Sequence, residues 1–179
     1  PEAAGVTEQP VDTRRAPGEA LLARLDAVQA RLEEHAASEP ASGLTDPDPP
    51  TGERWDWGQV WAHLAEFVPY WSGEVRLIVG AEGADPVPFG RVKTDPGRVA
   101  AIEADRDRPP RELMARLSRH LDELRGLIRD LRPGDWERQG LHPTLGVMDM
   151  PAVFDDFLVG HLESHADQLD GLRANADPD

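Results

Sequence analysis

Two histidines, His161 and His165, lie four residues apart in a segment with helical periodicity. Residues at this spacing project from one face of a helix about one turn apart, so both imidazoles could bind the same metal ion. The pair falls in the middle of an apolar stripe that includes Phe154, Leu158 and Leu172. Imidazoles that face a core need a polar partner there. The spacing therefore indicates either two metal ligands or two hydrogen-bonded core histidines.

His63 is a candidate third ligand, because it shares a helical face with the apolar residue Phe67. Three imidazoles leave coordination positions open to water or substrate, which is typical of catalytic rather than structural metal sites. We expect Zn or Ni, with Fe or Co as alternatives, since imidazole nitrogen suits all four. His120 also lies on an apolar face and competes with His63 for this place. His35 and His142 are expected to pack at the surface or in a loop.

The elements that must position these residues are helices. Apolar residues at helical spacing predict long helices over residues 18–37, 56–80, 109–131 and 150–174, and a short one over 99–105. Asp56 is the expected N-cap of the second helix, and Pro69 inside it is expected to produce a kink. Loops are expected over 38–54, 81–98 and 135–150, with a flexible arm over 1–17 and a tail over 175–179. No stretch alternates with period two for long enough to be a strand. The pattern predicts an all-α four-helix bundle over residues 18–174.

Composition excludes several classes of function. The chain has 179 residues, no cysteine and a formal net charge of −15. Without cysteine there is no thiolate ligand or nucleophile, so any thiol in the chemistry must come from outside the chain. Acidic proteins repel nucleic-acid phosphates, and no apolar run of about 18 residues suggests a membrane span. We therefore expect a cytoplasmic protein with neither nucleic acid nor membrane as a partner; no secretory signal is visible.

The basic residues are concentrated in the middle of the chain. Residues 91–132 hold 11 of the 19 Lys and Arg residues, interleaved with Asp and Glu. This pattern favours helix surfaces carrying salt bridges. The alternative is an anion-binding patch around Arg91, Lys93 and Arg98, which could bind an anionic thiol or carboxylate as cosubstrate.

Three segments resemble the DinB-like superfamily. Residues 57–66, WGQVWAHLAE, resemble the opening of its second helix, and residues 160–169, GHLESHADQL, are similar to its last helix. The connector GLHPTLG, residues 140–146, resembles the loop before that helix. The resemblance covers residues 18–174 and implies a four-helix bundle of up-down-down-up type.

The same resemblance implies a divalent metal held by His63, His161 and His165, with His120 outside the site. Members of the superfamily include bacillithiol transferases and mycothiol-dependent maleylpyruvate isomerases. The implied function is a metal-dependent thiol S-transferase or thiol-dependent isomerase that takes a small thiol and an electrophile. The Arg-rich, Lys-poor composition favours mycothiol as that thiol. A non-catalytic bundle, with a structural metal or buried histidines, and a metal-dependent hydrolase are the alternatives.

Groups next to the ligands complete the prediction. Glu66 lies one turn after His63 and Tyr70 follows it, while Gln168 lies three residues after His165. Side chains of these types orient metal-bound imidazoles. We predict Glu66 and Tyr70 as catalytic groups, Tyr70 as a proton donor or substrate contact; ordinary helix packing is the alternative for both. The tryptophan surplus is expected in the core or at an interface, and with the resemblance it predicts a homodimer.

Overall fold

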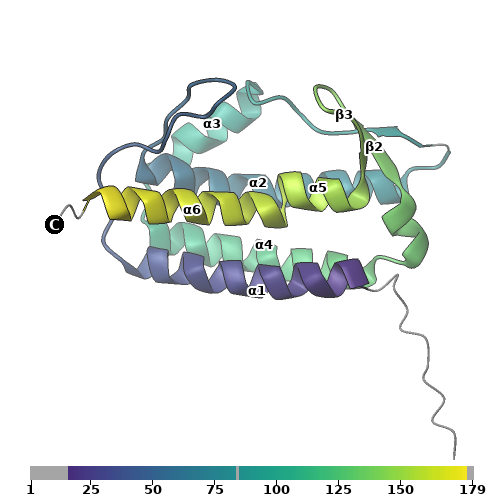
Figure 1. Ribbon diagram of the computed structural model, residues 1–179, viewed down its shortest axis with the longest axis horizontal. Coiled ribbons are helices and arrows are strands. Elements are labelled where there is room, and N and C mark those ends of the chain that lie inside the picture. Colours follow the sequence, from purple (N-terminus) through teal and green to yellow (C-terminus); the bar gives the residue numbers. More distant parts are fainter. Residues whose placement is uncertain (1–15, 84, 177–179) are drawn as a thin grey trace, which may run out of the picture.

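The computed structural model describes residues 16–83 and 85–176 as a bundle of long helices with a small sheet at one end (Figure 1). The helices are α1 (Ala16–Ala37), α2 (Trp57–Gly80), α3 (Pro96–Asp105), α4 (Pro110–Asp130), α5 (Met150–Phe157) and α6 (Val159–Ala176), and η1 (Pro133–Glu137) is a 3-10 helix. The strands are β1 (Val87–Pro88), β2 (Gln139–His142) and β3 (Gly146–Asp149). The four long helices α1, α2, α4 and α6 confirm the predicted all-α bundle.

The directions of the helices agree with the up-down-down-up arrangement. In Figure 1, α1 and α6 run one way along the bundle, and α2 and α4 run the other way. Helices α4 and α6 each pack against both α1 and α2. Because α2 and α4 are parallel, the chain between them must return along the bundle. It does so through β1 and α3, and α3 packs on α2.

Helix α2 is the centre of the core and begins where the sequence predicts. The Asp56 carboxylate accepts from the Gln59 backbone N–H at 2.8 Å, and the Gln59 side-chain oxygen accepts from the Asp56 N–H at 3.0 Å. This reciprocal capping box satisfies two backbone donors that have no partner inside the helix. Trp57, Trp61 and Trp71 of this helix are all buried in the hydrophobic core.

The sheet is a correction to the sequence analysis, which expects no strand and a plain connector over 135–150. Strand β2 pairs in parallel with β1 and antiparallel with β3, in the order β1-β2-β3. Gly140 and His142 of β2 point inward, while Leu141 and its cross-strand partner Val147 are exposed. At Leu141, His142 and Val147 the usual pattern is reversed, although Met148 of β3 is buried, so no clear alternation marks the strands in the sequence.

The last helix is also corrected, because the single helix expected over 150–174 is two helices. It breaks at Leu158, which lies between α5 and α6 with φ −127° and ψ −92°. A Cβ atom on Gly160 would lie 2.4 Å from the backbone oxygen of Asp155. The chain can turn this tightly because residue 160 has no side chain. The break changes the rotational phase of α6 relative to α5.

Smaller differences lie at the ends of elements. Helix α3 begins at Pro96, three residues before the predicted start, and Asp95 caps it by accepting from the Arg98 N–H at 2.8 Å. The arm predicted over 1–17 falls outside the described residues as far as residue 15, as do residues 177–179 of the predicted tail. Among the described residues, none of the helices has the length and hydropathy that crossing a membrane requires.

Candidate metal centre

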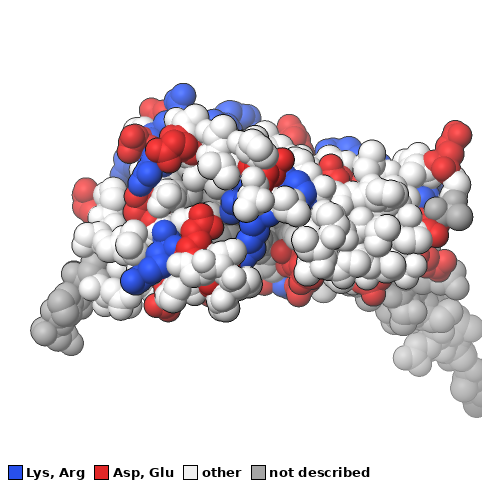
Figure 2. Space-filling model, turned by 90° about the horizontal axis from the view of Figure 1, so that it is seen from above, with Lys and Arg blue, Asp and Glu red and all other residues white. Residues whose placement is uncertain are grey.

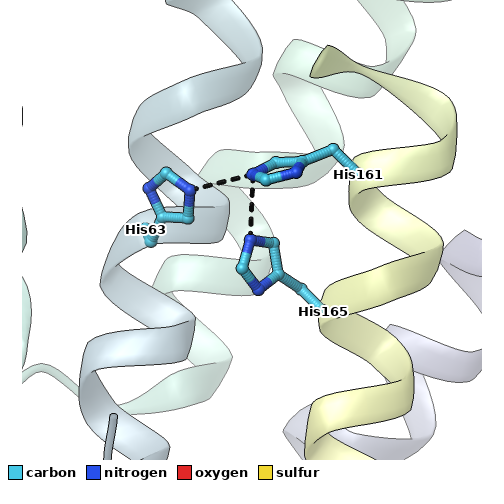
Figure 3. Close-up of side chains that lie close together, drawn as sticks. All are labelled: His63, His161 and His165. Atoms are coloured by element: carbon cyan, nitrogen blue, oxygen red, sulfur yellow. Dashed lines mark hydrogen bonds between the residues drawn. The ribbon is translucent and has the colours of Figure 1, made fainter. Parts of the chain in front are cut away.

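Three histidines from two facing helices converge on one point (Figure 3). His63 projects from α2, and His161 and His165 project from α6. His161 Nε2 lies 3.1 Å from His63 Nε2 and 3.0 Å from His165 Nε2. All three ligand atoms lie within 4.8 Å of one another. The inward pair predicted from spacing and His63, which the resemblance favours over His120, thus form one cluster that could hold a metal ion.

The outer ring nitrogens determine where the protons lie. His165 Nδ1–H donates to Gln168 Oε1 at 2.7 Å. His63 Nδ1 faces the carboxylate of Glu66, whose Oε2 lies 3.4 Å away, and a carboxylate favours an N–H on that side. The Nε2 atoms of His63 and His165 therefore carry lone pairs directed at the centre of the cluster.

The contacts between the three Nε2 atoms indicate whether the residues fit a metal ion. If His161 Nε2 carries a proton, its single N–H can point at only one of its two neighbours, and the lone pair of the other has no donor. If it carries none, both contacts near 3 Å bring two lone pairs together. A cation between the three nitrogens would satisfy all of them at once. The donor set of three neutral imidazoles fits a divalent transition metal.

Burial keeps the imidazoles neutral. Burial lowers the pKa of His63 well below its ordinary value, and the neighbouring His165 and His161 lower it further. The pKa of His161 is also well below its ordinary value, for the same reasons. Burial lowers the pKa of His165 to about 4, against the hydrogen bond that it donates to Gln168, which raises it. Metal ions bind neutral imidazole, so the ligands are ready to bind at neutral pH.

A cavity of about 700 Å³ opens onto the three histidines. One wall is aromatic: the Trp55 ring stacks on His165 with centroids 5.9 Å apart, and Trp71 stacks on Phe157 at 4.0 Å. The other wall comes from residues 91–98, with Arg91, Lys93 and Arg98 among the lining residues. Figure 2 shows this face of the molecule, where basic side chains border a hollow near the middle and acidic side chains are interspersed.

The three basic residues differ in their partners. Arg91 forms a salt bridge with Glu66, and Lys93 Nζ lies 2.7 Å from Asp48 Oδ2. The Arg98 guanidinium lies over the Trp55 ring, 5.2 Å from its centroid, and has no carboxylate within 4.0 Å among the described residues. All three predicted cationic residues therefore reach the cavity, but only Arg98 reaches it without an ion-pair partner.

The two predicted catalytic residues, Glu66 and Tyr70, lie behind the cavity rather than in its lining. Glu66 and Tyr70 are absent from the residues that line it. Glu66 faces His63 and Arg91, and the Arg91 guanidinium lies 3.8 Å above the Tyr70 ring. Burial, followed by the nearby Glu74 carboxylate, raises the pKa of Tyr70. The two side chains thus contact groups that reach the site, rather than the cavity itself.

The remaining histidines lie outside the cluster. His120 is part-exposed on α4, with its Nδ1 3.5 Å from Glu123 Oε2. His35 is buried rather than at the surface, and its Nε2 lies 2.9 Å from Asp170 Oδ1. His142 lies buried in strand β2 rather than in the expected loop, and it lines the cavity. Its Nε2–H donates to the Arg91 carbonyl at 3.2 Å.

Sequence reasoning missed Trp55, Leu145 and Phe157 as cavity residues. Trp55 and Leu145 lie in loops, where no periodicity indicates which way a side chain points. Helical spacing places Phe157 on the same face as His161, but it does not show that this face opens onto a cavity.

The fold and the site define a helical bundle in which imidazoles from facing helices meet below a cavity and could hold a metal ion. A family model for the DinB superfamily matches residues 24–169. The chain belongs to the DinB superfamily.

A solved structure has a similar fold. YfiT from Bacillus subtilis, described as a probable metal-dependent hydrolase with an unusual four-helix bundle topology, matches with a TM-score of 0.70 and 18% sequence identity. The match covers 96% of this chain and 93% of that chain. At this identity the likeness shows the fold. No curated protein matches the sequence.

Proposed function

We propose that this protein is a divalent-metal-dependent thiol S-transferase, which joins a low-molecular-weight thiol to a small electrophile. The observation that supports it is the cluster of three imidazoles, within 4.8 Å of one another, at a cavity of about 700 Å³. The cluster contains no fourth His, Cys, Asp or Glu from the described residues. His63, His161 and His165 would hold the metal, Zn or Ni before Fe or Co, and leave room for a ligand from the cavity.

The thiol comes from outside, because the chain contains no cysteine. The resemblance to bacillithiol transferases and mycothiol-dependent isomerases supports a thiol as cosubstrate, and the composition favours mycothiol. A divalent metal, when bound, lowers the pKa of a thiol or water in its open position and so supplies a nucleophile near neutral pH. In the overall reaction the thiol loses its proton, its sulfur forms a bond to carbon, and the leaving group departs with the electron pair of the broken bond.

The chain's own residues orient the reactants. Gln168 fixes the ring of His165, and Glu66 faces the outer nitrogen of His63 while it holds Arg91. Tyr70 supports the Arg91 guanidinium from below. In this proposal Glu66 and Tyr70 are positioning residues that act through His63 and Arg91. The rings of Trp55 and Phe67 pack against the imidazoles and keep bulk water away from two sides of the cluster.

The test is thiol consumption by the metal-loaded protein. Mycothiol and bacillithiol are each incubated with an activated chloroarene, and the conjugate and released chloride are measured. We expect turnover by the metal-loaded protein and its loss in His161→Ala. His120→Ala is the matched control and should keep full activity, because His120 lies outside the cluster. Thiol consumption that is the same in His161→Ala and in the wild type would contradict the proposal.

A metal-dependent hydrolase is the second candidate, favoured by the described function of YfiT and by a cavity open to water. The same protein preparation is offered ester and amide substrates without any thiol. Metal-dependent cleavage in the absence of thiol, together with no thiol conjugation, would favour hydrolysis over S-transfer.

A further inference from the structure

One buried charged side chain in the cavity, that of Arg98, forms no salt bridge with the described residues. The exposed fraction of Arg98 is 9%, and its Nη1 donates to a neutral acceptor, the Lys93 carbonyl oxygen, at 2.7 Å. Its Nε and Nη2 have no acceptor among the described residues. Buried arginines are normally paired, since desolvation of an unpaired charge is costly. Arg98 therefore lacks the anion that its surroundings require.

Other arginines in the described part of the chain show what is unusual about Arg98. The side chains of Arg91 and Arg125 are 12% and 13% exposed, and each has a carboxylate partner. The arginines without carboxylate partners, apart from Arg98, are exposed at the surface. An unpaired buried guanidinium is thus confined to the cavity above the three histidines.

The backbone increases the local positive charge. Arg98 is the third residue of α3, where the helix macrodipole is positive and disfavours a cationic side chain. Its cavity neighbour Lys93 adds a further positive charge, although Asp48 pairs with it. Glu53, and more weakly Glu66 and Asp48, also act electrostatically on Arg98, but none of these carboxylates lies within 4.0 Å of it. The Asp95 carboxylate already caps the positive end of α3, so an anion in the cavity would pair with the Arg98 guanidinium.

Part of the remaining lining is apolar, although the carboxylates Asp48, Glu53 and Asp156 also line the cavity. Trp71 and Phe157 stack at 4.0 Å and line one wall, and Leu145 at the tip of the β2–β3 hairpin lines it with 57% of its surface exposed. An exposed leucine at a cavity can pack on the apolar part of a bound ligand. The ligand that matches this lining carries a negative group at one end and an apolar body at the other.

We propose that the cavity binds an organic acid, with its carboxylate on the Arg98 guanidinium and its apolar body against Trp71, Phe157 and Leu145. The planar guanidinium fork matches a carboxylate in a bidentate pair. This proposal rests on the proposed function in one respect: it assigns the electrophilic substrate of that site to the carboxylic acids. The binding itself does not require turnover.

The experiment measures binding of a saturated acid that cannot react. 3-Phenylpropionate and its neutral isostere 3-phenylpropanamide are titrated calorimetrically into the metal-loaded and the metal-free protein. We expect the wild type to prefer the acid by about tenfold or more, as hydrogen bonds to a charged group provide. Arg98→Gln should lose this preference, while Arg119→Gln should keep it, because Arg119 is exposed and does not line the cavity.

Two further variants keep the test valid if Arg98→Gln does not fold. Arg98→Lys retains the charge but loses the fork, so its preference for the acid should weaken. Glu53→Gln changes an exposed side chain and should strengthen binding of the acid, but not of the amide. Equal binding of acid and amide by the wild type, or an undiminished preference in Arg98→Gln, would overturn the proposal. If the acid preference depends on Arg98 but no thiol is consumed, the S-transferase proposal fails while the acid site stands.

Discussion

At the scale of single residues, the three histidines occupy different positions around one point. His161 is the central ligand, because its Nε2 lies within 3.1 Å of both other Nε2 atoms. Two imidazoles cannot hold a divalent metal as tightly as three. We predict that His63→Ala, His161→Ala and His165→Ala each lower bound metal at least about tenfold. Elemental analysis of purified protein measures this. His120→Ala should retain the wild-type metal content, and unchanged metal in all three variants would rule out the site.

A second prediction at this scale concerns Glu66. Its carboxylate faces His63 Nδ1 at 3.4 Å and also pairs with Arg91. Glu66→Gln removes the charge that favours a proton on Nδ1 and a lone pair on Nε2. We expect metal affinity to fall roughly 10- to 100-fold, as for other partners of metal-bound histidines. Competition with a chelator gives the affinity.

The control for Glu66 has the same spacing on another helix. Glu123 lies three residues after His120, with its Oε2 3.5 Å from Nδ1. Glu123→Gln should leave metal affinity unchanged. If both substitutions weaken metal binding equally, the effect is one of surface charge and Glu66 has no special role.

The histidine cluster could be predicted from the sequence, whereas its surroundings could not. Spacing of four residues and the phase of the apolar stripe are local properties of a helix, so they placed His161 and His165 together. Trp55 stacks on His165 from a loop, and Arg98 lies over Trp55 from the start of α3. These contacts depend on how the chain returns between helices, which local periodicity does not determine.

At the scale of elements, the break between α5 and α6 positions the metal centre. It requires a residue without a side chain at position 160, where a Cβ would lie 2.4 Å from the Asp155 oxygen. We predict that Gly160→Ala lowers the free energy of unfolding by about 1–3 kcal/mol, the usual cost of overpacking. Denaturant-induced unfolding of the metal-free protein measures it.

Gly171 on the same helix is the matched control. A Cβ there would have no atom within 4 Å, and the position is exposed. Gly171→Ala should stabilise the protein by about 0.5–1 kcal/mol, because alanine is the better helix former. Destabilisation by both substitutions would mean that α6 does not tolerate alanine in general, and that the break has no special requirement for glycine.

The elements differ in how well the sequence predicts them. Long helices bury one face, so their apolar residues recur at a fixed spacing, as Leu117, Leu121 and Leu124 do on α4. The strands show no such regular spacing of apolar residues. In β2 the inward positions are Gly140 and His142, and Phe89 lies so close to Gly140 that a Cβ there would be 2.5 Å from its ring. Tertiary packing, rather than local pattern, produces this sheet.

At the scale of the whole molecule, the uneven charge of the sequence is paired across helices. Arginines of α1 hold the acidic helices α5 and α6: Arg24 bonds to Glu163 and Asp155, and Arg31 bonds to Asp167 and Asp170. The interleaved charges of the middle segment behave as predicted, since Arg106 pairs with Asp56 and Glu103. Exposed pairs of this kind contribute little each. They set which helices meet, and they leave Arg98 as the buried arginine without a carboxylate in the described chain.

The same molecule should lose stability in mild acid when it holds no metal. The pKa of His165 is about 4 in the fold, against about 6.5 in an unfolded chain, and burial also lowers the pKa values of His63, His161, His35 and His142. Between these values the unfolded chain binds more protons than the fold, so stability falls as pH falls from about 6.5 toward 4. For His165 alone, the loss at pH 5 is on the order of 2 kcal/mol.

Denaturant unfolding of the metal-free protein at pH 8, 7, 6 and 5 tests this, since most carboxylates remain ionised over that range. His165→Gln removes one buried imidazole, so its stability should depend less steeply on pH, whatever its stability at pH 8. His120→Gln is the control, because it removes a histidine that lies outside the cluster. A wild-type stability that is flat or rises toward pH 5 would mean that the imidazoles of the cluster take up protons within the fold. In that case they would not be the neutral, lone-pair-bearing ligands that the metal centre requires.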